Sequence, residues 1–145
     1  MTSGLNPLIK EITDFEQLQA FVSEHEGNLI DLSKTYYCSL GTDLGFDTYA
    51  PYSVSKGTAL FELDVVWLTA QNIEVAFEFE FGNIEEFLSA LAKLILCEPE
   101  LSVVFVSSRS HAINFETASE LAQNIAKFKK NLLIVDISDE TYELI

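Results

Sequence analysis

The chain of 145 residues carries 23 acidic and 8 basic side chains, which give a net charge of −15 at pH 7. Its length predicts one domain over residues 1–145, and its 48% hydrophobic content argues against disorder. The acidic excess also argues against the basic surface with which nucleic-acid-binding proteins usually neutralise phosphates. Short apolar runs, no basic leader and two widely separated cysteines, Cys38 and Cys97, predict a cytoplasmic protein without membrane contact.

The first half of the chain is predicted to hold one helix followed by strands. The helix begins at Thr13 or Asp14, since Thr13 has capping-box spacing to Glu16, and Gly27-Asn28 ends it. From Leu29 onward the sequence is predicted to be β-rich, with the aromatic pair Tyr36 and Tyr37 in a strand. The strands expected here cover residues 36–38, 48–54 and 58–68.

The second half alternates between predicted strands and helices. Asn83 precedes a periodic apolar stripe and has Glu86 three residues on, and Asn114 opens a second such helix. The continuous apolar run from Leu101 is typical of a strand that is covered on both faces. The expected order is α-β-β-β-α-β-α-β, which predicts an α/β fold with a mixed central sheet flanked by helices. The strands of this half cover residues 73–81, 101–107 and 132–137, and residues 139–145 form a short tail.

Two neighbouring strands carry carboxylates where a core strand should be apolar. Side chains alternate along a strand, so Glu78 and Glu80 share one face, and Asp64 joins them if its strand pairs with theirs. Neither strand carries a Lys or Arg, so the three carboxylates repel one another. A bound divalent cation would relieve that repulsion, and oxygen ligands suit Mg²⁺ or Mn²⁺. The alternative is a solvated strand face on which Glu74 is also exposed.

These segments resemble the PD-(D/E)xK nucleases, which have the restriction-endonuclease-like fold. The resemblance extends from the first predicted helix to the last strand and implies hydrolysis of DNA phosphodiester bonds with Mg²⁺ or Mn²⁺. Its sharpest part is carried by Leu63-Asp64-Val65-Val66-Trp67, by Val75-Ala76-Phe77-Glu78-Phe79-Glu80, and by the helix after Asn83 that contains Lys93.

The resemblance also implies roles for individual residues. Asp64 and Glu78 would bind the metal directly, with the backbone carbonyl of Phe79 as a third ligand. Glu80 stands where most relatives have lysine, and in this E-x-E variant it would act as a general base or bind a second metal. Lys93, or Lys56 before the Asp64 strand, would then supply the missing cation.

A second hypothesis is an acidic interaction protein that keeps the nuclease fold without catalysis. The net charge of −15 favours it, because such a surface would bind a basic protein partner or mimic DNA. A nuclease with this charge would need a homodimer, a basic partner or the metal itself to approach DNA. Arg109 and His111 follow the strand that begins at Leu101 and lie either in a phosphate-contacting loop or in an ordinary surface loop.

Overall fold

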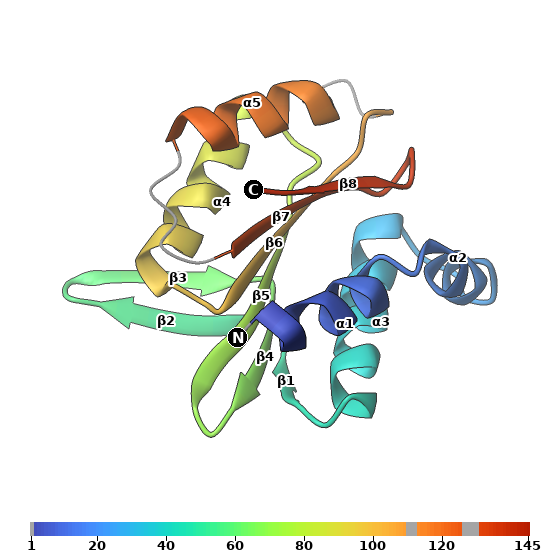
Figure 1. Cartoon of the computed structure of the whole chain (residues 1–145), viewed down its shortest axis with the longest axis horizontal. Coiled ribbons are helices and arrows are strands. Elements are labelled where there is room, and N and C mark those ends of the chain that lie inside the picture. The colour runs from blue at the N-terminus through green and yellow to red at the C-terminus, as the bar shows by residue number, and fades with distance from the viewer. Residues whose placement is uncertain (1, 110–112, 126–130) are drawn as a thin grey trace.

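The computed structural model describes residues 2–109, 113–125 and 131–145, and it has a three-layer arrangement of helix, sheet and helix (Figure 1). The helices are α1 (Thr2–Ile12), α2 (Phe15–Ser23), α3 (Leu29–Asp43), α4 (Ile84–Cys97) and α5 (Phe115–Ile125). The strands are β1 (Asp47–Tyr49), β2 (Tyr52–Lys56), β3 (Ala59–Leu63), β4 (Val65–Thr69), β5 (Asn72–Phe79), β6 (Leu101–Val106), β7 (Asn131–Asp136) and β8 (Thr141–Leu144). Within the described ranges, no helix is both long and apolar enough to cross a bilayer.

Six strands form the central sheet in the order β1-β4-β5-β6-β7-β8. The central strands β5, β6 and β7 are parallel, because α4 and α5 return the chain to the same edge between them. The outer pairings β1–β4, β4–β5 and β7–β8 are antiparallel. The start of β4 therefore lies at the same edge of the sheet as the carboxyl ends of β5, β6 and β7.

Each face of the sheet carries its own hydrophobic core. Helices α1, α2 and α3 cover one face and α4 and α5 cover the other, as Figure 1 shows. Alternation along β5 sends Val75 and Phe77 to the α3 side and Ala76 to the α4 side. Every residue of β6 is buried, as expected for a strand that is covered on both faces.

Helix α3 lies unusually close to the sheet at Gly41. A Cβ atom built on Gly41 would lie 2.3 Å from Nε1 of Trp67, so only glycine fits there. This approach lets the Trp67 indole donate a hydrogen bond of 2.9 Å to the carbonyl of Tyr37, one helical turn before Gly41. The contact fixes α3 against β4 and thereby positions the side chains on the rest of the helix.

The expected mixed sheet flanked by helices is confirmed, but the expected element order is wrong in the first half. Residues 36–38, predicted as a strand, lie inside α3. Asn28 caps that helix by accepting from the backbone N–H of Asp31, and Tyr37 donates to the carbonyl of Ile12 at 2.7 Å. A cap and tertiary packing thus override the strand preference of two adjacent tyrosines. Helix α1 and strand β8 were also not predicted.

The predicted strand 58–68 is two strands that belong to different sheets. Among the described strands, β3 pairs only with β2 in a two-stranded hairpin, whereas β4 pairs with β1 and β5 in the central sheet. The chain leaves one sheet and enters the other at Asp64. The hairpin extends away from the central sheet in Figure 1, and its Tyr52 and Val54 pack against the core on the α4 side.

Candidate functional site

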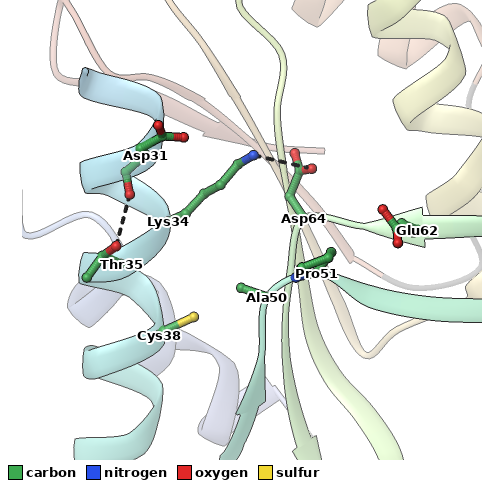
Figure 2. Close-up of a pocket in the computed structure, with 8 residues that line it drawn as sticks. All are labelled: Asp31, Lys34, Thr35, Cys38, Ala50, Pro51, Glu62 and Asp64. Carbon is green, nitrogen blue, oxygen red and sulfur yellow. Dashed lines mark hydrogen bonds and ion pairs between the residues drawn. The ribbon is translucent and has the colours of Figure 1, made fainter. Parts of the chain in front are cut away.

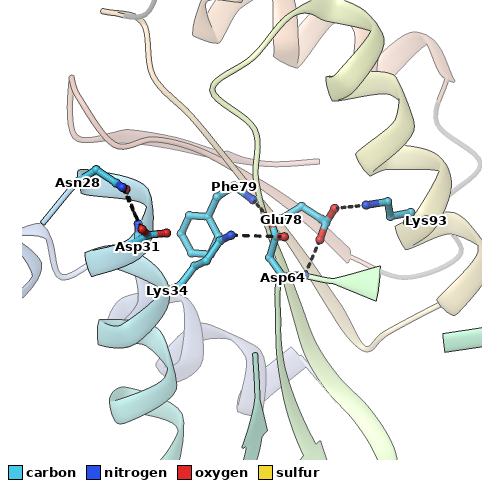
Figure 3. A network of polar contacts seen from close by, with 7 residues as sticks. All are labelled: Asn28, Asp31, Lys34, Asp64, Glu78, Phe79 and Lys93. Atoms are coloured by element: carbon cyan, nitrogen blue, oxygen red, sulfur yellow. Dashed lines mark hydrogen bonds and ion pairs between the residues drawn. The ribbon is translucent and has the colours of Figure 1, made fainter. Parts of the chain in front are cut away.

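The carboxylates of Asp64 and Glu78 each accept a hydrogen bond from a backbone N–H of the facing segment. Val65 pairs with Phe77 in the register of β4 and β5, which places Asp64 opposite Glu78. The Asp64 N–H donates to Oε2 of Glu78 at 2.8 Å, and the Phe79 N–H donates to Oδ2 of Asp64 at 2.9 Å (Figure 3). Two side chains therefore replace the ladder hydrogen bonds at the point where the chain turns into the hairpin.

Glu78 is a buried carboxylate with a raised pKa. Its side chain is 1% exposed, and Nζ of Lys93, on α4, lies 3.2 Å from its Oε1. Burial and, next, the charge of Asp64 raise the Glu78 pKa to about 7, although Lys93 and the Asp64 N–H act to lower it. The predicted alternative of a solvated strand face is therefore wrong for Glu78.

Asp64 faces a pocket of about 600 Å³ between α3, the bend at Ala50 and Pro51, and the start of β4 (Figure 2). Lys34 reaches across the pocket from α3, and its Nζ lies 3.8 Å from Oδ1 of Asp64. Figure 3 shows Lys34 and Lys93 approaching the two carboxylates from opposite sides of the sheet. The residues that line the pocket are Asp31, Lys34, Thr35, Cys38, Ala50, Pro51, Glu62 and Asp64.

Glu80 pairs chiefly with Glu86. Burial, then the charges of Glu86 and Asp64 and a hydrogen bond between the two glutamates, raise the Glu80 pKa to about 7. The Glu86 carboxylate lies over the Cα of Gly82, where an added Cβ would be 2.7 Å from its oxygens. Among the described residues, no three acidic, His or Cys side chains are close enough together to hold a metal. The expected cluster of three carboxylates is thus divided into two contacting pairs, Asp64 with Glu78 and Glu80 with Glu86.

The structure distinguishes between the two lysines that were considered as the cation of the site. Lys93 contacts Glu78, whereas Lys56 ends β2 in the hairpin and is exposed. The sequence-based prediction missed Lys34, because residues around it were assigned to a strand. It also considered Glu86 only as a capping residue, although its position in the first turn of α4 brings it back to Glu80.

The backbone N–H and C=O groups of Phe79 both face the carboxylate of Asp64. Its N–H points to Asp64, whereas the next N–H, of Glu80, donates to the carbonyl of Phe105 on the other side of β5. The N–H and C=O of one strand residue leave on the same side, so the Phe79 carbonyl also faces Asp64. The predicted use of that carbonyl as a metal ligand requires this orientation and stays a prediction.

A second buried carboxylate, Asp136, ends β7 at the same edge of the sheet. It accepts hydrogen bonds from the N–H and hydroxyl groups of Ser108 and Ser138 and from the N–H of Asp139. Burial alone would raise its pKa, but these donors outweigh burial and lower it. Arg109 follows Ser108 with an exposed side chain, and His111 lies outside the described residues.

Comparisons with known proteins add little to this geometry. No protein-family model matches the sequence, and no curated protein matches it. Among solved structures, AF1548, a protein of unknown function, is similar with a TM-score of 0.48 and 15% identity. The match covers 71% of this chain and 55% of AF1548, so the chain spans about half the length of that protein. A likeness this weak assigns neither a family nor a function.

Proposed function

We propose that the protein is a metal-dependent nuclease that hydrolyses DNA phosphodiester bonds, with Asp64 and Glu78 as metal ligands. The observation that carries the proposal is the pair of hydrogen bonds that these carboxylates accept across the strands, Glu78 from the Asp64 N–H and Asp64 from the Phe79 N–H. Folding brings them together from positions 14 residues apart, even though burial beside a like charge raises the pKa of Glu78 to about 7. Paired carboxylates with perturbed pKa values are typical of catalytic and metal sites.

The available donors fit a hard divalent cation. Mg²⁺ commonly uses one or two protein carboxylates and completes its coordination with water and substrate phosphate oxygens. Asp64 and Glu78 would supply the carboxylates, and the Phe79 carbonyl faces the same place. A bound Mg²⁺ or Mn²⁺ would polarise the phosphate and lower the pKa of an attacking water. The pairing of Glu80 with Glu86 favours a single-cation site over one in which three carboxylates converge.

The remaining residues would orient groups and move protons. Lys93 holds Oε1 of Glu78 and would fix that carboxylate while its positive charge offsets the repulsion from Asp64. The same ammonium would stabilise negative charge that develops on the phosphate, as the lysine of the third motif does in the resembling family. Glu80, which Glu86 and burial keep protonated to higher pH, would exchange a proton with the reacting groups.

Calorimetric titration of Mn²⁺ and Mg²⁺ into the wild type and Asp64→Ala tests the proposal. Saturable binding to the wild type that is lost in Asp64→Ala is expected, because one of two carboxylate ligands is removed. Asp43→Ala is the control, since it removes an exposed carboxylate at the end of α3. Cleavage of single-stranded, duplex and branched DNA by the wild type but not by Asp64→Ala would establish the activity. Full cleavage by Asp64→Ala would refute the assignment.

The net charge of −15 favours a second candidate, an acidic interaction protein that binds a basic partner or mimics DNA. This candidate predicts no saturable metal binding, either alone or with a hydrolysis-resistant DNA duplex. It also predicts association with a DNA-binding protein that weakens steeply as salt is added. The titration above therefore separates the two candidates before any substrate is known.

A further inference from the structure

The oxygens of Asp64 and Glu78 are not equally engaged. Three of the four have a donor within hydrogen-bond distance: Oδ2 of Asp64, and Oε1 and Oε2 of Glu78. Among the described residues, the fourth oxygen, Oδ1 of Asp64, has only the ammonium of Lys34 at 3.8 Å, which is an ion pair without a short hydrogen bond. This weakly held oxygen is the one on the pocket side (Figure 2).

Lys34 is free to leave Asp64. The side chains of Lys34 and Asp64 are 34% and 28% exposed, so water screens the attraction between them and the net energy of the pair is small. The lysine also has a flexible four-carbon stem and a single point charge, and it can turn without any backbone movement. Lys93 differs, because its partner Glu78 is buried and their contact is shorter.

The pocket is too acidic to hold an anion unless another cation is present. Asp31, Glu62 and Asp64 line it with Lys34 as the facing base, so a phosphate entering alone would meet excess negative charge. Asp31 is turned partly aside, since its Oδ2 accepts from the side chain of Asn28 at 2.9 Å. A divalent cation on Asp64 would compensate that carboxylate and leave the Lys34 charge available to a new partner.

We propose that Lys34 is an exchangeable counter-ion, which leaves Asp64 when a divalent cation binds and then binds a backbone phosphate of the nucleic acid in this pocket. The inference rests on the proposed function and adds a substrate-binding role for a residue of α3. It also explains how a protein with net charge −15 admits a polyanion. The cation and the phosphate enter together, each removing the repulsion that would oppose the other.

The inference predicts changes of opposite sign for Lys34→Met. Mn²⁺ alone should bind this variant more tightly than the wild type, because its competitor for Oδ1 of Asp64 is gone. A hydrolysis-resistant phosphorothioate DNA duplex in saturating Mn²⁺ should bind about tenfold more weakly, because a charged contact to phosphate is lost. The slope of log affinity against log salt should fall by about 0.9. A purely structural role for Lys34 would weaken both ligands together.

Calorimetry for Mn²⁺ and fluorescence anisotropy for the labelled duplex measure the two effects. Lys10→Met is the matched control, since it removes an exposed lysine of α1 that does not line the pocket. Thermal unfolding verifies that each variant is folded, and a phosphorothioate RNA duplex tests whether RNA supplies the phosphate instead. Opposite changes for Lys34→Met with none for Lys10→Met support the inference.

Other outcomes overturn the inference in distinguishable ways. If the wild type binds Mn²⁺ and the duplex but Lys34→Met binds both as the wild type does, Lys34 has no such role and the proposed function stands. If Mn²⁺ binding weakens in Lys34→Met, the lysine supports the site and does not compete for it. If the wild type binds neither ligand, the proposed function fails and the inference fails with it.

Discussion

Asp136 and Glu78 are both buried carboxylates at one edge of the same sheet, and their surroundings are opposite. Asp136 is surrounded by donors from Ser108, Ser138 and Asp139, which lower its pKa. Glu78 has one backbone donor, one lysine and a neighbouring carboxylate, and its pKa is raised to about 7. The donors around Asp136 stabilise its ionised carboxylate. Burial and the charge of Asp64 instead make the ionised form of Glu78 unfavourable.

The difference separates a carboxylate that stabilises the fold from one that belongs to the proposed site. Asp136 connects the loop after β6 to the loop after β7, because its carboxylate accepts hydrogen bonds from both loops. Asp64 retains capacity for an external ligand, because among the described residues its Oδ1 has only the ammonium of Lys34 at 3.8 Å. Four measurements test this contrast between the two carboxylates.

Replacing Asp136 with alanine should have the largest effect on stability. The partly buried donors of Ser108 and Ser138 would lose their buried acceptor, and we expect a loss of about 3 to 4 kcal/mol in the free energy of unfolding. Urea denaturation measures the loss. Asp139→Ala is the control, because its side chain is exposed and only its backbone contacts Asp136. An equal effect of the two changes would contradict a structural role for the Asp136 carboxylate.

Added Mn²⁺ should stabilise the wild type through the Asp64–Glu78 pair. At a concentration about 100 times its Kd, a ligand that binds only the folded state adds about 2.7 kcal/mol. Thermal unfolding with and without Mn²⁺ measures this gain, which should be absent in Asp64→Asn. An undiminished gain in Asp64→Asn would place the cation elsewhere.

Glu78→Gln should change how stability depends on pH in metal-free buffer. The raised pKa means that the folded protein holds the Glu78 proton more tightly than the unfolded chain does. Its contribution is therefore fully present below about pH 4.5 and is lost as pH rises towards 7. We expect the wild type to lose about 2 kcal/mol of unfolding free energy across this pH range through Glu78. Glu78→Gln has no titrating carboxyl at this position and should not show that loss. Parallel stability curves for the two proteins between pH 4.5 and 7 would contradict the raised pKa of Glu78.

The stability that Asp136 contributes depends on pH in the opposite direction. Its lowered pKa contributes stability above the ordinary value of 3.8, and that stability is lost as pH falls through the folded value. The two carboxylates therefore act in separate pH windows, one acidic and one between about 4.5 and 7. Unfolding measured across both windows distinguishes them in a single series.

Glu86→Gln should have the smallest effect. At pH 8 it relieves repulsion with Glu80, but it also removes a favourable negative charge from the first turn of α4. Glu85→Gln removes the same helix charge without the contact to Glu80 and is the matched control. We expect Glu86→Gln to be more stable than Glu85→Gln by about 0.5 kcal/mol at pH 8. The difference should disappear near pH 5, where Glu80 is protonated, and a constant difference would exclude repulsion as its cause.

The second half of the fold was predictable because its patterns are local. The apolar run in β6 and the capped stripes of α4 and α5 identify their elements without reference to other segments. Helix α3 was not predictable in the same way, since Tyr36 and Tyr37 favour strands and the helix depends on packing against Trp67. The break between β3 and β4 at Asp64 also depends on contacts with β5 that no local pattern contains.

The candidate site was predictable only where strand alternation applies. Asp64 and Glu78 come together as expected, because Asp64 directly precedes β4 and Val65 of β4 pairs with Phe77 of β5. Glu80 departs from the expectation, since β5 ends at Phe79 and the chain beyond it turns towards α4. Lys34 was missed because its distance from Asp64 depends on how a helix packs, which residue spacing does not reveal.

The close approach at Gly41 makes the geometry of the site depend on a residue without any polar side chain. Gly41 lies about two helical turns from Lys34 along α3, and the Trp67 indole leaves no room for a larger residue. A methyl group there would lift the helix and carry the ammonium of Lys34 away from Asp64. In a mutational screen for function, substitutions of Gly41 should therefore reduce function as substitutions of the charged pocket residues do. Gly41 has this effect although it has no side chain to contact a ligand.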